Sequence, residues 1–233
     1  MLTVTPLRIA TYNLQKCVGL DLRRRPGRSL AVINALKAQV VVLQEVDKRL
    51  PPRPAALPHD MVEDDGWHIL PFGAPGGSLG WHGNAMLVRD AVQVIETAHI
   101  NLPGLEPRGA IRAELATPLG PLRVIGMHLG LVQRYRLLQL GAINRALAVL
   151  PLRPTVFAGD FNDWGNGMAL DAAVKQVRFI PARASFPAPR PVAPLDRIAL
   201  SPDLQAVESG VHDTRPARIA SDHLPVWADL TVK

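Results

Sequence analysis

The chain has 233 residues, of which 48% are hydrophobic and 20% are charged, and its formal net charge is +6. This apolar content excludes an intrinsically disordered chain, and the sequence holds no run of about 18 uncharged apolar residues that would cross a membrane as a helix. The single cysteine, Cys17, excludes an internal disulfide framework and a zinc site built from cysteines.

Arginine carries the basic excess, because only 5 of the 26 basic side chains are lysine. An arginine fork binds phosphate oxygens in pairs, so a phosphorylated partner explains the excess. A compositional bias toward arginine, proline and alanine explains it equally well. Segment 1–13 has no basic stretch followed by an apolar one, so we expect no secretory signal and a cytoplasmic location.

The hydrophobic pattern predicts many short strands and two main helices. In the first half of the chain, we expect a strand over 8–13, a helix over 28–37, a strand over 40–44, a proline-rich loop over 51–58, and strands over 67–72, 85–89, 92–97 and 110–115. In the second half, we expect a strand over 122–127, a helix over 132–150, a strand over 155–158, a second proline-rich loop over 181–194, and strands over 195–200 and 225–230. The uninterrupted apolar run 40–44 indicates a strand buried on both faces. Because no repeat or shift in composition divides the chain, these elements favour one layered α/β domain over 1–233.

Polar side chains that can carry chemistry stand at the ends of these apolar runs. They are Asn13, Glu45, His128, Asp160, Asn162, Asp196, Asp222 and His223. Charged groups at the ends of buried strands are costly unless they are paired, and strands that share a sheet would bring them to one rim. Carboxylates and amides without thiols suit Mg²⁺ or Mn²⁺, and histidines exchange protons near neutral pH.

Each motif taken alone has a purely structural explanation. The residues of GDFN, 159–162, favour a turn. A single His128 is commonly a hydrogen-bonded core residue, and a single Glu45 at a strand end is commonly solvated. Their occurrence together, in one order on one chain, favours a shared site.

These polar residues belong to motifs that follow one another in a definite order: Asn13, QE at 44–45, His128, GDFN at 159–162, DR at 196–197 and SDHLP at 221–225. This ordered series resembles the endonuclease/exonuclease/phosphatase superfamily, the deoxyribonuclease I-like metal-dependent phosphohydrolases. The resemblance runs from Arg8 to about Leu230, and GDFN together with SDHLP is its most specific part. It implies a four-layer α/β/β/α sandwich, in which two mixed, mostly antiparallel sheets pack face to face with the site at one edge.

The resemblance also implies a role for each matching residue. Glu45 corresponds to the direct metal ligand, with Asn13 and Asp222 beside it in the metal shell. Asp160 corresponds to the carboxylate that orients and activates the attacking water. Asn162 corresponds to the amide that holds a phosphate oxygen.

The remaining matches concern proton transfer and substrate contacts. His223 corresponds to a general base or phosphate contact, which Asp196 orients. His128 corresponds to the general acid that some branches use for the leaving oxygen. Arg108 is expected to contact phosphate, and Asn84 lies on a strand that feeds the site in relatives.

These roles predict a hydrolase of phosphoester bonds that uses Mg²⁺ (or Mn²⁺) and an activated water, most simply a phosphodiesterase or nuclease. Nucleic acid is then the expected substrate. A phospholipid headgroup, as in sphingomyelinases, and a small phosphodiester or phosphomonoester are the alternatives. A catalytically silent binding module would require the loss of a catalytic group, and none is missing. We expect no obligate protein partner.

The sequence departs from particular branches of the superfamily. Abasic-site endonucleases place a tyrosine where His128 stands, which argues against that activity. The carboxylate that pairs with the acid histidine in deoxyribonuclease I-like nucleases is absent from 81–84, so His128 has no evident partner. The arginines of 21–28 are either phosphate-steering groups or part of a solvated loop. Trp81 and Trp164 either flank a substrate or pack against the protein.

Overall fold

The computed structural model describes residues 5–48, 54–73, 77–165 and 167–233. The proline-rich loop expected over 51–58 therefore lies outside the described residues at 51–53. The loop expected over 181–194 contains neither helix nor strand, apart from isolated bridge pairing between Phe186 and Ala193.

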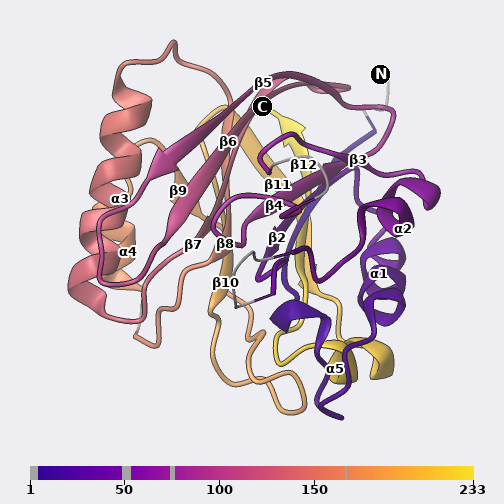
Figure 1. Ribbon diagram of the computed structural model, residues 1–233. Helices are drawn as coiled ribbons and strands as arrows, with labels where there is room; N and C mark the ends of the chain where they lie inside the picture. The colour runs from indigo at the N-terminus through magenta and orange to yellow at the C-terminus, as the bar shows by residue number, and fades with distance from the viewer. Residues whose placement is uncertain (1–4, 49–53, 74–76, 166) are drawn as a thin grey trace.

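Two six-stranded sheets form the centre of the molecule (Figure 1). The first sheet has the order β11 (Leu204–Val211), β12 (Val226–Val232), β1 (Leu7–Asn13), β2 (Val40–Gln44), β4 (Ala85–Val88) and β3 (His68–Ile69). The second has the order β5 (Gln93–Asn101), β6 (Gly109–Thr117), β7 (Gly120–His128), β8 (Thr155–Asp160), β10 (Asp196–Leu200) and β9 (Arg178–Phe179). The pairs β1–β2 and β7–β8 are parallel and the other pairs are antiparallel, so both sheets are mixed.

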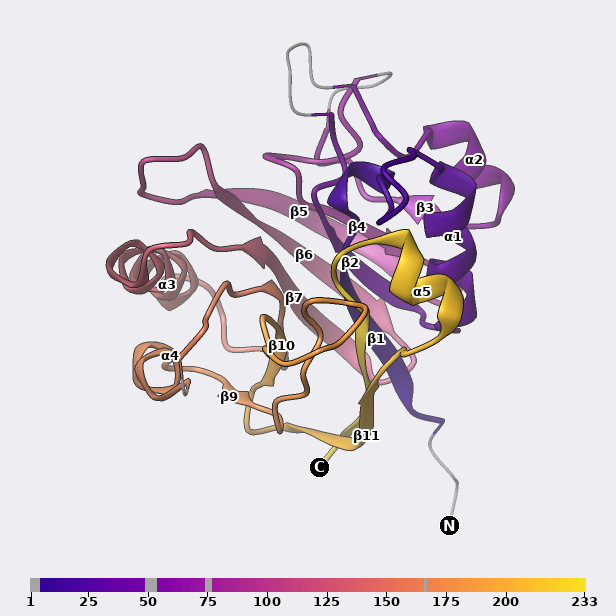
Figure 2. The ribbon, with the colours of Figure 1, turned by 90° about the horizontal axis from the view of Figure 1, so that it is seen from below.

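Helices cover the outer face of each sheet. On the first sheet they are η1 (Gln15–Cys17), α1 (Pro26–Ala35), α2 (His59–Asp64) and α5 (Arg215–Ala220), and on the second they are α3 (Gln133–Ala148) and α4 (Met168–Ala173). Figures 1 and 2 show the two groups of helices on opposite sides of the paired sheets. The four-layer α/β/β/α sandwich expected from the sequence is therefore confirmed.

Alternation along the strands explains why the sheets pack on both faces. Val40 and Val42 of β2 point into the core between the sheets, whereas Val41 and Leu43 pack under the helices. This arrangement is what an uninterrupted apolar run predicts. None of the helices in the described ranges has the length and apolar character needed to cross a bilayer.

The expected strands and helices match the observed ones to within a few residues, except that 67–72 reduces to β3. The pattern failed to predict β11, the three-residue 3₁₀ turn η1 and the short elements α2, α4, α5 and β9. As an edge strand, β11 has only one buried residue, so it lacks the apolar alternation of a buried strand. The three unpredicted α-helices have six residues each, too few to establish a helical period.

Candidate active site at the rim of the two sheets

Strand register brings the predicted site residues together. In the parallel pair β1–β2, Asn13 lies beside Gln44, which precedes Glu45. In the parallel pair β7–β8, His128 lies beside Asp160. Asp196 begins β10 and pairs with Asp160 across the antiparallel ladder. One rim of the sandwich, at the carboxyl ends of β1 and β8, therefore collects side chains from both sheets.

The Asp160 carboxylate lies at the centre of this cluster. Its Oδ2 accepts a hydrogen bond from Asn13 Nδ2 at 3.1 Å and lies 3.3 Å from His128 Nε2 and 3.8 Å from His223 Nε2. Its Oδ1 accepts a hydrogen bond from the backbone N–H of Asn162 at 2.9 Å. Burial, followed by the charge of Asp196, raises the pKa of Asp160 to about 7, although His223 opposes the rise.

A buried chain of three side chains orients His223. The Nδ1 atom of its ring lies 2.8 Å from Asp196 Oδ2, which also accepts a 2.6 Å hydrogen bond from Ser185 Oγ. Burial disfavours the charged ring, but the charge and hydrogen bond of Asp196, with Asp160 and Asp222, raise the pKa of His223 to about 10. His223 is therefore a cation at neutral pH, with Nδ1 bound to Asp196 and Nε2 directed toward Asp160.

His128 has the opposite protonation. Burial, and then the positive charges of Arg108, His223 and Lys16, hold its pKa well below the ordinary value, so its ring is neutral. The sequence left this histidine without an evident partner. The structure supplies one from the neighbouring strand, because Asp160 lies across the β7–β8 ladder from it.

Two residues of GDFN have conformations that explain their identities. A Cβ atom at Gly159 would lie 2.0 Å from the carbonyl oxygen of Met127. Only glycine therefore permits the close approach of β8 to β7 that places His128 against Asp160. Asn162 adopts a left-handed conformation, with φ of 50°, which asparagine tolerates better than most residues. Its amide nitrogen donates a 2.9 Å hydrogen bond to the Leu129 carbonyl.

The residues predicted to bind the metal offer oxygen atoms on the first-sheet side of the rim. Glu45 and Asp222 are close enough for their charges to interact, since burial and then the Glu45 carboxylate raise the pKa of Asp222 against the opposing effect of His223. A buried oxygen, Asp196 Oδ1, has no hydrogen-bond partner among the described residues. These hard oxygen donors fit a divalent cation.

A second set of donors lies beside the first. Ligand atoms of Asp160, Asp196 and His223 all lie within 4.8 Å of one another, so this buried group can also hold a metal. The His223 ring is already bound to Asp196 through Nδ1, however, which suits an oriented proton carrier. The placement of the metal against the carboxylate of Glu45 stays a prediction from the sequence.

Comparison with known proteins identifies the family. A model of the endonuclease/exonuclease/phosphatase family matches residues 10–223. The chain belongs to this family. Members of the endonuclease/exonuclease/phosphatase family are metal-dependent phosphoester hydrolases, and the buried cluster around Asp160 agrees with that chemistry.

The chain is also similar to a curated relative and shares its fold with solved structures. The uncharacterized protein YbhP of Escherichia coli K12 is 28% identical over 243 residues, which cover 96% of this chain and 95% of YbhP. The structure of D. rerio TDP2 complexed with a single-strand DNA product has a TM-score of 0.75 and 18% identity, covering 97% of this chain and 99% of that one. A mannosyl-6-phosphatase of Bacteroides thetaiotaomicron has a TM-score of 0.73 and 19% identity, with coverage of 97% and 99%.

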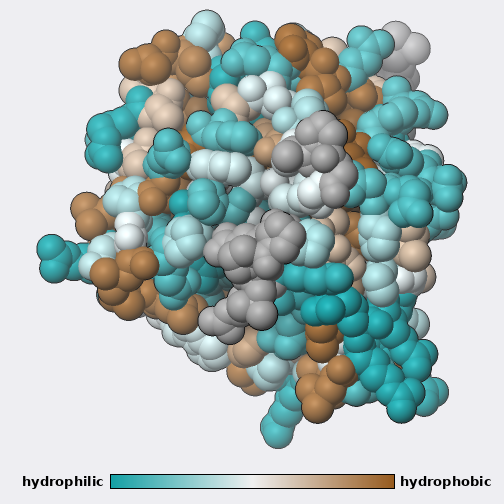
Figure 3. All heavy atoms as spheres, viewed as in Figure 1, coloured by the Kyte–Doolittle hydropathy of each residue, from teal (hydrophilic) through white to brown (hydrophobic). Residues whose placement is uncertain are grey.

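A polar pocket of about 330 Å³ opens beside the buried cluster around Asp160, and His128 of that cluster lines it. Its lining residues are Lys16, Glu45, Asp47, Lys48, His82, Gly83, Glu106, Arg108, His128 and Leu131. Arg108 lines this pocket, and its guanidinium is paired with Glu106 at 2.7 Å, so its contact with phosphate stays a prediction. Figure 3 shows a largely hydrophilic area at the lower right, with hydrophobic side chains at its lower edge. The segment joining η1 to α1 contributes the exposed Leu20 and Leu22 as well as its arginines.

Asn84 has a different position from the other predicted site residues. Its side chain is buried and donates a 2.9 Å hydrogen bond to the carbonyl of Gly109, which joins the start of β4 to β6. It does not line the polar pocket, so a direct substrate contact remains a prediction. Trp81 packs nearby, stacked on His99 with ring centroids 4.4 Å apart, and therefore has a structural role.

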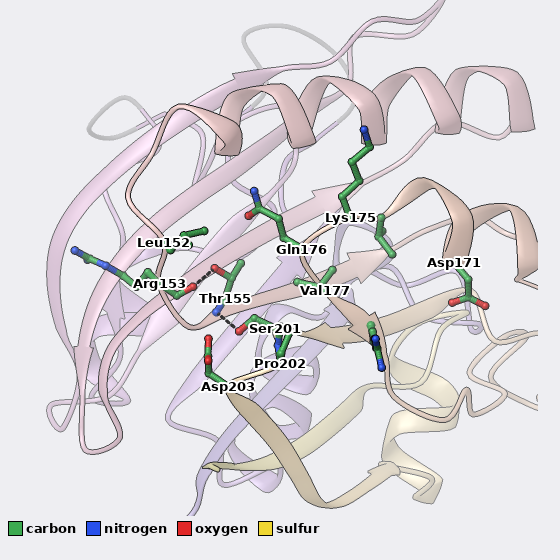
Figure 4. A pocket seen from close by; sticks show the side chains of 12 residues that line it. Leu152, Arg153, Thr155, Asp171, Lys175, Gln176, Val177, Ser201, Pro202 and Asp203 are labelled. Carbon is green, nitrogen blue, oxygen red and sulfur yellow. Dashed lines mark hydrogen bonds between the residues drawn. The ribbon is translucent and has the colours of Figure 1, made fainter.

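A larger hollow of about 470 Å³ lies away from the family's site residues (Figure 4). There Thr155 donates its backbone N–H to Ser201 Oγ and its hydroxyl to the carbonyl of Arg153. Because Thr155 begins β8 and Asp160 ends it, this hollow lies at the opposite end of the strand from the catalytic rim. A choice based on cavity volume alone would therefore select a site that lacks the predicted catalytic residues.

Sequence reasoning missed three contributors to the rim. Ser185 lies in the proline-rich loop expected over 181–194 and hydrogen-bonds to Asp196. Arg136 of α3 donates hydrogen bonds to Asp163 and to the Leu131 carbonyl, which ties together the segments that follow β8 and β7. Lys16 pairs with Glu45. None of the three stands at the end of an apolar run, which was the signal that identified the other residues.

Proposed function

We propose that the protein is a Mg²⁺-dependent phosphodiesterase, most simply a nuclease. The observation that carries this proposal is the contact of Asp160 with Asn13, His128 and His223 in one buried cluster beside Glu45. This cluster combines a proton acceptor, a cationic donor and oxygen ligands, which are the groups that hydrolysis of an anionic ester requires.

Each residue then has a defined task. Bound Mg²⁺ would neutralise charge on the phosphate and polarise its oxygens, held by Glu45 with Asn13 and Asp222. Asp160, when ionised, accepts a proton from the attacking water. The His223 cation holds a phosphate oxygen through Nε2, because Asp196 occupies Nδ1.

His128 completes the reaction on the leaving side. Its lowered pKa keeps the ring neutral before substrate arrives. An anionic phosphate entering the pocket raises that pKa, since an adjacent negative charge favours the protonated ring. The imidazolium then donates its proton to the departing oxygen.

An aromatic surface beside His223 supports a substrate that contains rings. The Phe186 ring lies 4.8 Å from the His223 ring and 5.5 Å from the Trp164 ring, which is edge-on to it. Trp164 is 61% exposed, so its face is accessible to a nucleobase. D. rerio TDP2, which shares the fold, was crystallised with a single-strand DNA product.

Activity profiling tests this proposal. The protein should hydrolyse DNA or RNA with Mg²⁺ or Mn²⁺ and lose activity in EDTA, and Asp160→Asn should lower turnover by about 10²–10⁴-fold with an unchanged circular dichroism spectrum. Near-normal turnover of Asp160→Asn would refute the role of that carboxylate.

Salt dependence separates the substrate classes. Nucleic-acid binding should weaken steeply as the salt concentration rises, because the protein displaces counterions from the phosphates and added salt makes that release less favourable. Flat salt dependence with turnover of phospholipids or small phosphomonoesters would replace the nuclease assignment by one of those activities. The cytoplasmic location expected from the sequence remains a prediction.

A further inference from the structure

Lys16 makes two contacts with the residue assigned to bind the metal. Its backbone N–H donates a 3.0 Å hydrogen bond to the carbonyl of Glu45, and its ammonium group forms an ion pair with the Glu45 carboxylate. The two side chains are 29% and 27% exposed, so the pair lies at the mouth of the polar pocket. In this structure, the ammonium group is therefore the cation against Glu45.

A strained turn places Lys16 there. Gln15, Lys16 and Cys17 have φ values of 45°, 58° and 57°, which are three successive left-handed conformations without a glycine. Such conformations are unfavourable and persist where surrounding contacts impose them, most often at functional sites. The Arg24 guanidinium helps to hold the turn through a 3.2 Å hydrogen bond to the Lys16 carbonyl.

The turn also contacts the other residues assigned to the metal. The backbone N–H of Gln15 donates to Asn13 Oδ1 at 3.0 Å, and Gln15 Oε1 accepts the backbone N–H of Asp222 at 3.1 Å. With the Lys16–Glu45 pair, this short segment touches all three predicted ligands. A substitution of Lys16 should therefore directly affect the residues that are expected to bind the metal.

The surroundings give the Lys16 ammonium group an alternative position. It shares the polar pocket with Lys48, Arg108 and His128, and it is close enough to His128 to contribute to lowering the pKa of that ring. An ammonium group and a divalent cation repel each other at one carboxylate. An anionic phosphate in the same pocket would attract the ammonium group.

We propose that Lys16 competes with the metal for Glu45 and, once the metal has displaced it, binds the substrate phosphate. The inference rests on the proposed function, because it assigns Glu45 to the metal. It predicts that removal of one cation changes two affinities in opposite directions: the metal binds more tightly and phosphate binds more weakly.

Mn²⁺ binding, measured by electron paramagnetic resonance without substrate, tests the first half. Lys16→Met should bind Mn²⁺ about tenfold more tightly than the wild type. Lys48→Met is the matched control, since it removes the same charge from the same pocket without touching Glu45, and it should change Mn²⁺ affinity by less than about twofold. Lys16→Arg retains the cation and should resemble the wild type.

Inorganic phosphate, titrated calorimetrically into the Mn²⁺-saturated proteins, tests the second half. Lys16→Met should weaken phosphate binding by about tenfold, and Lys16→Arg should restore most of it. Lys16→Gln repeats both measurements in case the methionine variant folds poorly. An unchanged Mn²⁺ affinity, or an unchanged phosphate affinity, in both neutral variants overturns the inference. Failure of the wild type to bind Mn²⁺ instead overturns the proposed function.

Discussion

Asn13 of the first sheet donates a 3.1 Å hydrogen bond to Asp160 of the second, and the two buried side chains are 147 residues apart in the chain. Asn13 Oδ1 meanwhile accepts the backbone N–H of Gln15. One amide thus links the carboxylate expected to activate water with the turn that contacts Glu45. The packing of the two sheets sets the distance between the metal side and the proton-transfer side of the site.

The pH dependence of stability should reveal the cost of burying Asp160. Burial and Asp196 raise its pKa from 3.8 to about 7, so the folded protein retains a proton that the unfolded chain loses between these values. This group favours folding below about pH 4, and that contribution disappears as the pH rises to about 7. In EDTA, Asp160→Asn should therefore have the higher Tm at pH 8, with an advantage that shrinks toward pH 4.

Asp171→Asn is the control for this measurement, because Asp171 is an exposed aspartate on α4. Its Tm should follow that of the wild type across the same range. If the curves for Asp160→Asn and the wild type run parallel from pH 4 to pH 8, the raised pKa is wrong.

Glu45→Ala should raise the Mg²⁺ concentration needed for half-maximal activity by at least about tenfold, because a direct carboxylate ligand is lost. Glu106→Ala removes a carboxylate from the same pocket, where it is paired with Arg108, and should leave the metal requirement nearly unchanged. Identical Mg²⁺ titrations for Glu45→Ala and the wild type would count against direct ligation.

His128→Ala should slow substrates with poor leaving groups far more than those with good ones, since only a basic leaving oxygen needs a proton in the transition state. A series of aryl phosphodiesters of graded leaving-group pKa measures this as a steeper dependence of log kcat/KM. Equal losses across the series would show that His128 does not act as the acid.

Glu114 should be important for stability but not for catalysis. Its buried carboxylate accepts hydrogen bonds from Arg112 Nη1 at 2.5 Å, Arg123 Nε at 2.6 Å and Arg153 Nη1 at 3.0 Å. Glu114→Ala removes the acidic partner of the buried Arg123 and one of the two partners of Arg112, and breaking a buried ion pair typically costs about 3–5 kcal/mol. Thermal unfolding should show a lower Tm, whereas the kcat per folded molecule should stay unchanged.

Glu96→Ala provides the comparison, because the Glu96 side chain is 57% exposed and forms an ion pair with Arg112. Its Tm should fall much less than that of Glu114→Ala. Similar losses of Tm in the two variants would show that the burial of Glu114 does not increase its contribution to stability.

Many arginines are engaged in ion pairs within the protein, as the three around Glu114 are. Arg28 binds both carboxylate oxygens of Asp21, at 2.9 and 3.0 Å, and Arg8 binds both of Asp229 at 2.7 Å. These arginines hold the fold together, so the count of basic residues overstates the charge available to a phosphorylated partner. Composition could not distinguish these uses, because an ion pair depends on the position of a distant acid.

The sequence by itself identified the family through an ordered series of motifs, and that resemblance implied the four layers and the candidate residues of the rim. Apolar runs specify buried strands locally, and polar residues at their ends must meet a partner or water, which made Asp160, His128 and Asp196 candidates that the ordered series of motifs then supported. Tertiary structure decided what these residues touch: His128 against Asp160, Ser185 on Asp196, and Lys16 on Glu45. Those contacts depend on strand register, sheet packing and left-handed turns, which arise from the whole chain rather than from any local pattern.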